Sequence, residues 1–148
     1  MGTRSTIKFI RKSGNDLTPL VNIYQQYDGY VEGVGYDLAK WLKGKRIING
    51  IGMGQNTNAY ANGFECLIAQ FIRDFKKEVG GLYITTIDNS QEYDYQVIFD
   101  EDKMFGDKPF TFNTDGWDVD ELITIKVNSF FEGTPSELLE YKESEDDE

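Results

Sequence analysis

The sequence predicts an α+β fold in which an antiparallel sheet of about five strands carries helices packed on one face. Alternating apolar and polar residues, the pattern of half-buried strands, occur near the N-terminus and again in the second half of the chain. Between these regions, two segments place apolar residues three and four positions apart, as amphipathic helices do. The resulting order is ββααβββα, and such a grouping of strands apart from helices favours α+β.

A β-hairpin is predicted at the start of the chain, from strands at residues 5–11 and 20–26. Residues 13–16, Ser-Gly-Asn-Asp, provide turn chemistry because Gly and Asn tolerate positive φ. Pro19 lies where the second strand begins, so its missing N–H disrupts no ladder hydrogen bond. We therefore expect these two strands to pair directly.

Two helices are predicted in the middle of the chain. The first begins near Gly33 and Gly35, ends at Gly44, and presents an apolar face formed by Val34, Leu38, Trp41 and Leu42. The second is the longest, covers about residues 59–79, and ends at a Gly-Gly pair, residues 80–81. Its core-facing stripe consists of Phe64, Leu67, Phe71, Phe75 and Val79.

The C-terminal half is predicted to contain three strands and a short helix. The strands cover residues 82–87, 93–99 and 123–127, and a capping box, Thr134-Pro135-Ser136-Glu137, begins the helix. Residues 101–121 are predicted to be a long loop of the functional or mobile kind. We expect a single domain over residues 1–141, followed by an acidic disordered tail at residues 142–148.

The composition argues against several classes of function. The net charge is −11, from 26 acidic and 15 basic residues, so we expect no binding to a nucleic acid polymer. There is no histidine, the commonest metal ligand, and we expect neither a metal nor a cofactor. The single cysteine, Cys66, fits a reducing cytoplasm and a buried apolar position. No apolar run is long enough to predict insertion into a membrane.

The first candidate ligand-binding segment follows the second predicted strand. Its amides and carboxylate can hydrogen-bond the edge of a base or the hydroxyls of a ribose, and its phenol rings can stack on a base. The alternative is that the tyrosines belong to the core and the glutamines to a sheet edge. The candidate residues are Gln25, Gln26, Tyr27, Asp28 and Tyr30.

The second candidate segment is the glycine-rich run at residues 50–57, just before the long helix. Glycines let a backbone approach a ligand closely, and the N–H groups at a helix start attract anions. We therefore expect phosphate contacts from Gly52, Gly54 and Gln55, although the run lacks the lysine and hydroxyl spacing of a P-loop. Arg4 is the first candidate for a positive partner and Arg46 the second. The alternative is a tight loop that caps the helix.

Four motifs in order are similar to a known family. They are MGTRSTI at residues 1–7, YQQYDGY at residues 24–30, NGIGMG at residues 49–54 and FEGTP at residues 131–135. Together they resemble a family of small proteins encoded by tailed bacteriophages and prophages, over residues 1–141. The resemblance implies an accessory protein in the host cytoplasm that acts by binding rather than by catalysis. Some small phage proteins sequester nucleotide-derived signals of host defence in pockets of small oligomers, which implies a homodimer here.

The leading hypothesis is therefore a binding protein, not an enzyme, that sequesters a small nucleotide-derived ligand and blunts a host defence signal. One alternative is a protein–protein inhibitor of a host enzyme, with Phe110, Phe112 and Trp117 of the long loop as interface candidates. The other is a nucleotide hydrolase that uses carboxylates as acid and base, although no spacing of acids selects a pair.

Overall fold

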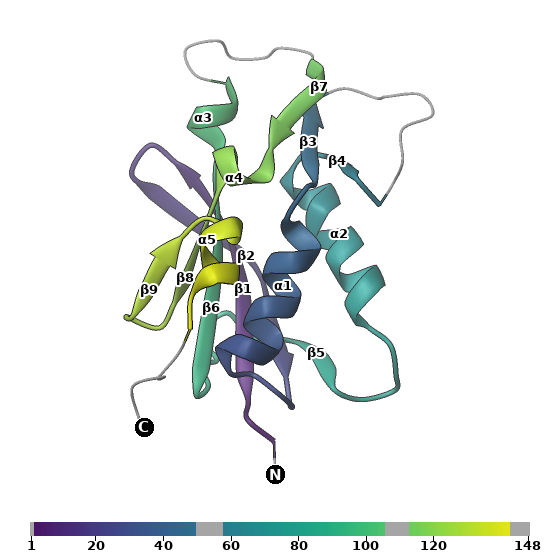
Figure 1. The fold of residues 1–148 in the computed structure, drawn as a ribbon, viewed down its shortest axis with the longest axis vertical. Coiled ribbons are helices and arrows are strands. Elements are labelled where there is room, and N and C mark those ends of the chain that lie inside the picture. The colour runs from purple at the N-terminus through teal and green to yellow at the C-terminus, as the bar shows by residue number, and fades with distance from the viewer. Residues whose placement is uncertain (1, 50–57, 106–112, 143–148) are drawn as a thin grey trace.

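A six-stranded sheet forms the centre of the molecule (Figure 1). The structure, a computed structural model, describes residues 2–49, 58–105 and 113–142. The strand order in this sheet is β5-β2-β1-β6-β8-β9. The strands are β1 (Ser5–Ser13), β2 (Asp16–Gln25), β5 (Leu82–Thr85), β6 (Tyr93–Asp100), β8 (Ile123–Val127) and β9 (Phe131–Gly133).

Most neighbouring strands in this sheet are antiparallel, which confirms the predicted α+β class. The exception is the central pair, because β1 and β6 run parallel from Ser5 opposite Tyr93 to Lys12 opposite Asp100. A parallel pair needs a crossover connection, and much of the chain between β2 and β6 serves this purpose. The sixth strand, β9, was not predicted.

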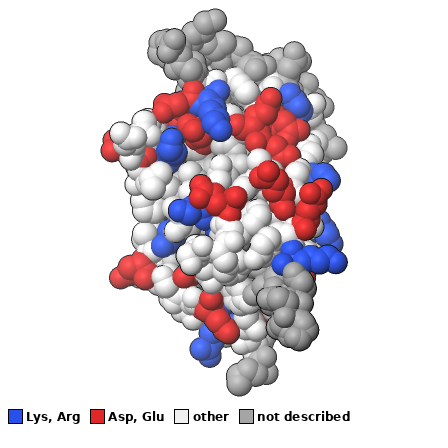
Figure 2. All heavy atoms as spheres, turned by 60° about the vertical axis from the view of Figure 1, so that its left-hand side comes forward, with Lys and Arg blue, Asp and Glu red and all other residues white. Residues whose placement is uncertain are grey.

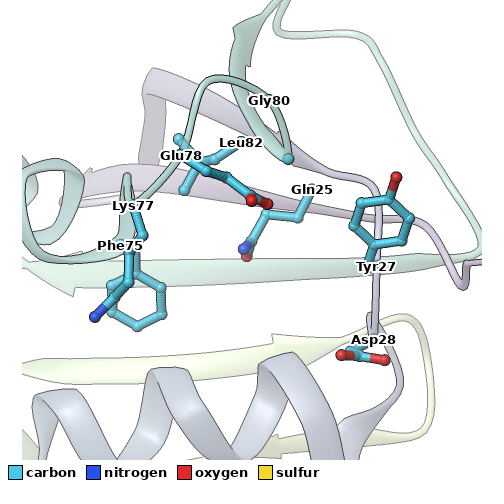
Figure 3. A pocket seen from close by; sticks show the side chains of 9 residues that line it. Gln25, Tyr27, Asp28, Phe75, Lys77, Glu78, Gly80 and Leu82 are labelled. Carbon is cyan, nitrogen blue, oxygen red and sulfur yellow. The ribbon is translucent and has the colours of Figure 1, made fainter.

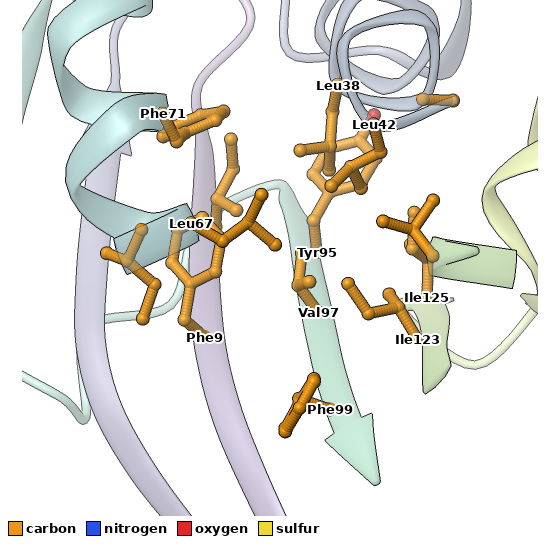
Figure 4. Close-up of a cluster of buried hydrophobic side chains, with 14 of the residues drawn as sticks. Phe9, Leu38, Leu42, Leu67, Phe71, Tyr95, Val97, Phe99, Ile123 and Ile125 are labelled. Atoms are coloured by element: carbon orange, nitrogen blue, oxygen red, sulfur yellow. The ribbon is translucent and has the colours of Figure 1, made fainter. Parts of the chain in front are cut away.

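Three helices cover one face of the sheet: α1 (Tyr36–Leu42), α2 (Phe64–Phe75) and α5 (Pro135–Glu140) (Figure 1). A short π-helical turn, η1 (Val31–Gly35), leads directly into α1. The apolar core lies between these helices and the sheet (Figure 4). Its fully buried side chains include Ile7, Phe9, Leu38, Leu67, Phe71, Tyr95, Val97, Ile125 and Leu138.

The predicted long helix is wrong at both of its ends. The chain around residues 60–62 forms a short strand instead, and Gly63, with φ of +90°, separates it from α2. At the other end, Lys76 already has extended backbone angles, and Val79, expected in the core, is 98% exposed. The reason is a competing set of hydrogen bonds, because the Lys76 ammonium group donates to three carbonyls of the following loop.

The segment predicted as a long loop contains regular structure. It holds α3 (Glu101–Phe105), β7 (Asn113–Asp118) and α4 (Val119–Leu122), although residues 106–112 lie outside the described residues. Strand β7 belongs to a second sheet with β3 (Arg46–Asn49) and β4 (Tyr60–Asn62), in the order β4-β3-β7. The missed signal is a capping box in which Asp118 accepts from the Asp120 N–H and Glu121 accepts from the Asp118 N–H.

Other local predictions are confirmed. The hairpin of β1 and β2 forms, and Gly14 in its turn has φ of +62°. Gly44 has φ of +85° just after α1, as expected for the residue that ends a helix. The Thr134 capping box is present, since the Thr134 hydroxyl accepts from the Glu137 N–H at 3.1 Å and the Glu137 carboxylate accepts from the Thr134 N–H at 2.8 Å.

The connection from β5 to β6 packs against the face of the sheet opposite the helices, and one buried asparagine fixes it. Asn22 is opposite Lys8 in the register, so its side chain points away from the face that carries Ile7. Its amide group donates to the carbonyls of Thr86 at 2.8 Å and Asn89 at 3.0 Å. Asn22 is fully buried as a result.

We expect Asn22→Ala to destabilise the protein by about 2 kcal/mol, because it leaves two carbonyls without their donor. Urea unfolding followed by circular dichroism measures this change. Asn15→Ala, in the exposed hairpin turn, is the control and should change stability by less than about 0.5 kcal/mol. Equal effects of the two substitutions would contradict the assigned role of Asn22.

Candidate ligand-binding groove

A hollow lies at the end of the main sheet where Gln25 of β2 is paired with Leu82 of β5. It consists of two adjoining pockets of about 300 Å³ and about 600 Å³ that share Gln25, Phe75 and Lys77. We call the two pockets together the groove. Its other lining residues are Tyr27, Asp28, Glu78, Gly80, Gly81 and Leu82 on one side, and Asp37, Trp41 and Asp74 on the other.

Gln25 and Phe75 line both pockets of the groove, and each has a fixed position because it belongs to a regular element. Gln25 is the last residue of β2, and Phe75 is the last residue of α2. The Phe75 ring stacks on Phe71, with 4.1 Å between ring centroids. In Figure 3 the Gln25 side chain lies between the Phe75 ring and the Tyr27 ring. The groove therefore presents an amide between two aromatic side chains.

A tight turn after β2 places Tyr27 and Asp28. Asp28 has φ of +59°, and its carbonyl accepts from the Val34 N–H at 2.7 Å. A Cβ atom at Gly33 would lie 2.2 Å from that carbonyl oxygen, so only glycine fits there. The carbonyl of Gly29 in turn accepts from the buried Tyr95 hydroxyl at 2.7 Å. These glycines allow the chain to pack on itself, which is a structural role that the sequence prediction did not include.

The loop between α2 and β5 forms another wall of the groove, and Lys76 stabilises it. The Lys76 Nζ donates to the carbonyls of Val79 and Gly80 at 3.3 Å each and of Leu82 at 2.8 Å. It also lies 5.4 Å from the centroid of the Tyr83 ring, within the range of a cation–π contact. One side chain thus fixes the backbone that carries Lys77 and Glu78.

The far wall is an ordered polar cluster around Asp74. The Trp41 indole N–H donates to Asp74 at 2.8 Å, and the Arg73 guanidinium donates at 2.7 and 3.0 Å. These bonds, that of Arg73 foremost, lower the pKa of Asp74 from 3.8 to about 2. The buried Lys45 side chain places its Nζ 4.4 Å from the centroid of the Trp41 ring. This burial lowers the pKa of the Lys45 ammonium group.

The structure brings three of the predicted ligand-binding residues together in the groove: Gln25, Tyr27 and Asp28. Gln26 and Tyr30 do not line it, although the Gln26 N–H donates to the Gly81 carbonyl at 3.1 Å beside it. Arg4 is exposed on the segment that precedes β1 and does not line the groove either. Gly52, Gly54 and Gln55 lie outside the described residues.

Sequence reasoning missed most of the wall formed by the helices. Trp41 and Phe75 were predicted only as core residues, yet both line the groove at the edge of the core. Asp37, Asp74, Lys77 and Glu78 carried no motif, because their proximity depends on how α1 and α2 cross the sheet. Arg46, the second positive candidate, instead donates to the Gly116 carbonyl at 2.8 Å.

Of the three aromatic residues proposed as a protein–protein interface, Trp117 alone lies among the described residues. Trp117 belongs to β7, opposite Ile47, and packs partly buried against the core, whereas Phe110 and Phe112 lie outside the described residues. On the face shown in Figure 2, the described acidic and basic side chains are interspersed. Within residues 2–49, 58–105 and 113–142, no three potential metal ligands lie close enough together to hold an ion, and no helix is long and apolar enough to span a bilayer.

No protein-family model, curated protein or solved structure matches this chain.

The Asp74 cluster predicts an acid-dependent loss of stability. Because the folded pKa of Asp74 is depressed to about 2 from 3.8, its contribution is present above pH 3.8 and is lost as the pH falls towards 2. We expect the Asp74→Asn variant to lose less stability than the wild type between pH 5 and pH 2.5. Urea unfolding at both pH values measures the difference, and Asp16→Asn in the hairpin turn is the control. The prediction is wrong if Asp74→Asn loses as much free energy of unfolding between pH 5 and pH 2.5 as the wild type does.

The Lys76 contacts predict a second, local effect. Lys76→Met removes three carbonyl partners while it keeps much of the apolar stem, so the loop of residues 76–82 should open more often. Hydrogen exchange followed by mass spectrometry should show at least about threefold faster exchange in peptides of this loop. Lys40→Met on the exposed side of α1 is the control, and unchanged exchange in Lys76→Met would show that the ammonium group does not hold the loop.

Proposed function

We propose that this protein binds a small nucleotide-derived ligand in the groove and holds it without chemical change. The observation that carries the proposal is the side-chain carbonyl oxygen of Gln25. Among the described residues, this oxygen is a buried acceptor with no hydrogen-bond partner, and its residue lines both pockets. A buried acceptor without a donor costs about 1–3 kcal/mol, and an N–H group of a ligand would remove that cost.

The aromatic side chains around Gln25 support a ring-shaped ligand. Tyr27 is 57% exposed, Phe75 and Trp41 are half-buried, and all three line the groove. Flat rings bury large apolar area with little loss of conformational freedom, and stacking of a base on an aromatic side chain contributes about 1–3 kcal/mol. A nucleobase that stacks on one of these rings lies beside Gln25, which lines both pockets of the groove.

Binding without turnover is the simplest function for these residues. Histidine is absent from the whole sequence, and Cys66 lies in α2, outside the lining of the groove. The four sequence motifs that resemble small phage and prophage proteins are the basis for proposing sequestration of a host defence signal as the purpose of such binding. In that role a homodimer in the host cytoplasm would remove the signal from its receptor, and the ligand would stay intact.

We expect the purified protein to deplete at least one compound from a mixture of nucleosides, cyclic nucleotides and ADP-ribose-type nucleotides. Mass spectrometry of the supernatant before and after heat denaturation measures both depletion and recovery. Recovery of the intact compound supports sequestration, whereas recovery of a product identifies an enzyme. No depletion of any compound would overturn the proposal.

Tyr27→Ala should weaken binding of the depleted compound about tenfold, because it removes an exposed ring that can stack on the ligand. Phe130→Ala is the matched control, since Phe130 is an exposed aromatic residue that does not line the groove. Calorimetric titration of the wild type and both variants provides the comparison. The groove is the wrong site if Tyr27→Ala and Phe130→Ala bind the compound equally well.

A further inference from the structure

The charged side chains of the groove point to a more specific class of ligand. Four carboxylates line it, those of Asp28, Asp37, Asp74 and Glu78, against a single ammonium group, that of Lys77. Asp74 is already engaged by Arg73 and Trp41. The other three carboxylates have no hydrogen-bond or ion-pair partner among the described residues. The groove is therefore rich in free acceptors and carries a negative field.

A phosphate group is a poor occupant of such a site. Each phosphate adds at least one negative charge, and the repulsion between unit charges 4 Å apart is about 1 kcal/mol even in bulk water. Lys77 is one cation against three free carboxylates, and all four side chains are exposed, so salt weakens the net repulsion of a phosphate without changing its sign. The phosphate contacts predicted from the sequence rested instead on Gly52, Gly54 and Gln55, which the structure does not describe.

The same acceptors suit a ring that carries N–H donors. Carboxylate and amide oxygens accept hydrogen bonds only, so a ligand that satisfies them must supply donors, which in a nucleoside are the amino group, ring N–H groups and ribose hydroxyls. The Gln25 side chain lies between the Phe75 and Tyr27 rings (Figure 3), so a base stacked on either ring lies beside this side chain. Hydrogen bonds to charged acceptors are about twice as strong as neutral ones, so each hydrogen bond that the ligand donates to a carboxylate would increase its affinity.

We propose that the groove binds a nucleoside with an amino-bearing base, and that phosphate groups on the ligand weaken this binding. This inference rests on the proposed function, because it names the ligand class of the same site. Gln25 accepts from the base edge, Tyr27 or Phe75 stacks on the ring, and Asp28 and Glu78 accept from the amino group or the ribose hydroxyls. The protein then distinguishes a dephosphorylated nucleoside from the nucleotides that contain the same base.

Calorimetric titration with adenosine, guanosine and cytidine, and with the 5′-triphosphate of each, tests this inference. We expect at least one nucleoside to bind, and its triphosphate to bind at least about tenfold more weakly at low salt. Purine riboside, which lacks the amino group of adenosine and carries no ring N–H, should bind about tenfold more weakly than adenosine if adenosine is the nucleoside that binds. Inosine, which lacks the amino group of guanosine, is the corresponding control for guanosine. A triphosphate that binds as tightly as its nucleoside overturns the inference and leaves the proposed function intact. The inference and the proposed function both fail if the protein binds no nucleoside and no nucleotide, including cyclic and ADP-ribose-type nucleotides.

Two variants assign the effect to named side chains. Asp28→Asn removes one charge without backbone strain, because Asn also tolerates the φ of +59° at this position. It should lower the ratio of the triphosphate Kd to the nucleoside Kd by about threefold, whereas Asp16→Asn, far from the groove, should leave this Kd ratio unchanged. Gln25→Leu should weaken nucleoside binding about tenfold but leave the Kd ratio unchanged, and a melting curve checks that the variant folds. An unchanged Kd ratio in Asp28→Asn, or an unchanged nucleoside affinity in Gln25→Leu, overturns the inference.

Discussion

The parallel pairing of β1 with β6 is the constraint on which the rest of this structure depends. Both strands begin at the same end of the sheet, and β2 already returns the chain to that end, because Gln25 and Tyr93 are both opposite Ser5. Before β6 can begin, the chain must still cross from the β2 side of β1 to the other side, and this crossover contains α1, α2 and β5. It covers one face of the sheet with helices and adds an edge strand beside β2. The groove is a consequence, because the end of β2, the end of α2 and the beginning of β5 meet there.

The sequence predicted the elements whose pattern is local. Strand alternation at residues 93–99 and the capping box at Thr134 depend only on neighbouring residues, and both are present. The failures occur where other contacts override the apolar pattern. Residues 60–62 fit a helical pattern but pair with the distant strand β3. Val79 fits an apolar stripe but lies in a loop that the nearby Lys76 ammonium group holds outside the helix.

At the candidate site too, the sequence predicted the residues with a local pattern and missed those brought together by packing. Gln25, Tyr27 and Asp28 stood out because amides, a phenol and an acid follow a strand directly, and the structure places all three in the groove. The sequence prediction gave the glycines beside them no part in placing these residues. Gly33 makes room for the Asp28 carbonyl, and Gly29 lies against Ser5 of β1. Lys77 and Asp37 could not have been predicted, since they are 40 residues apart in the sequence and only the packing of α2 and α1 brings them to one groove.

The position of Gln25 supports the proposed role of the groove in binding. Its partners in the register, Ser5 and Leu82, are buried, and the residue two positions before it on the same face is the core residue Ile23. An apolar side chain at this position would continue the core without an unsatisfied acceptor and would cost less free energy. A glutamine there is costly to the protein on its own. In the proposed role of the groove, a ligand that donates to this oxygen would remove that cost, so the glutamine would favour the complex over the free protein.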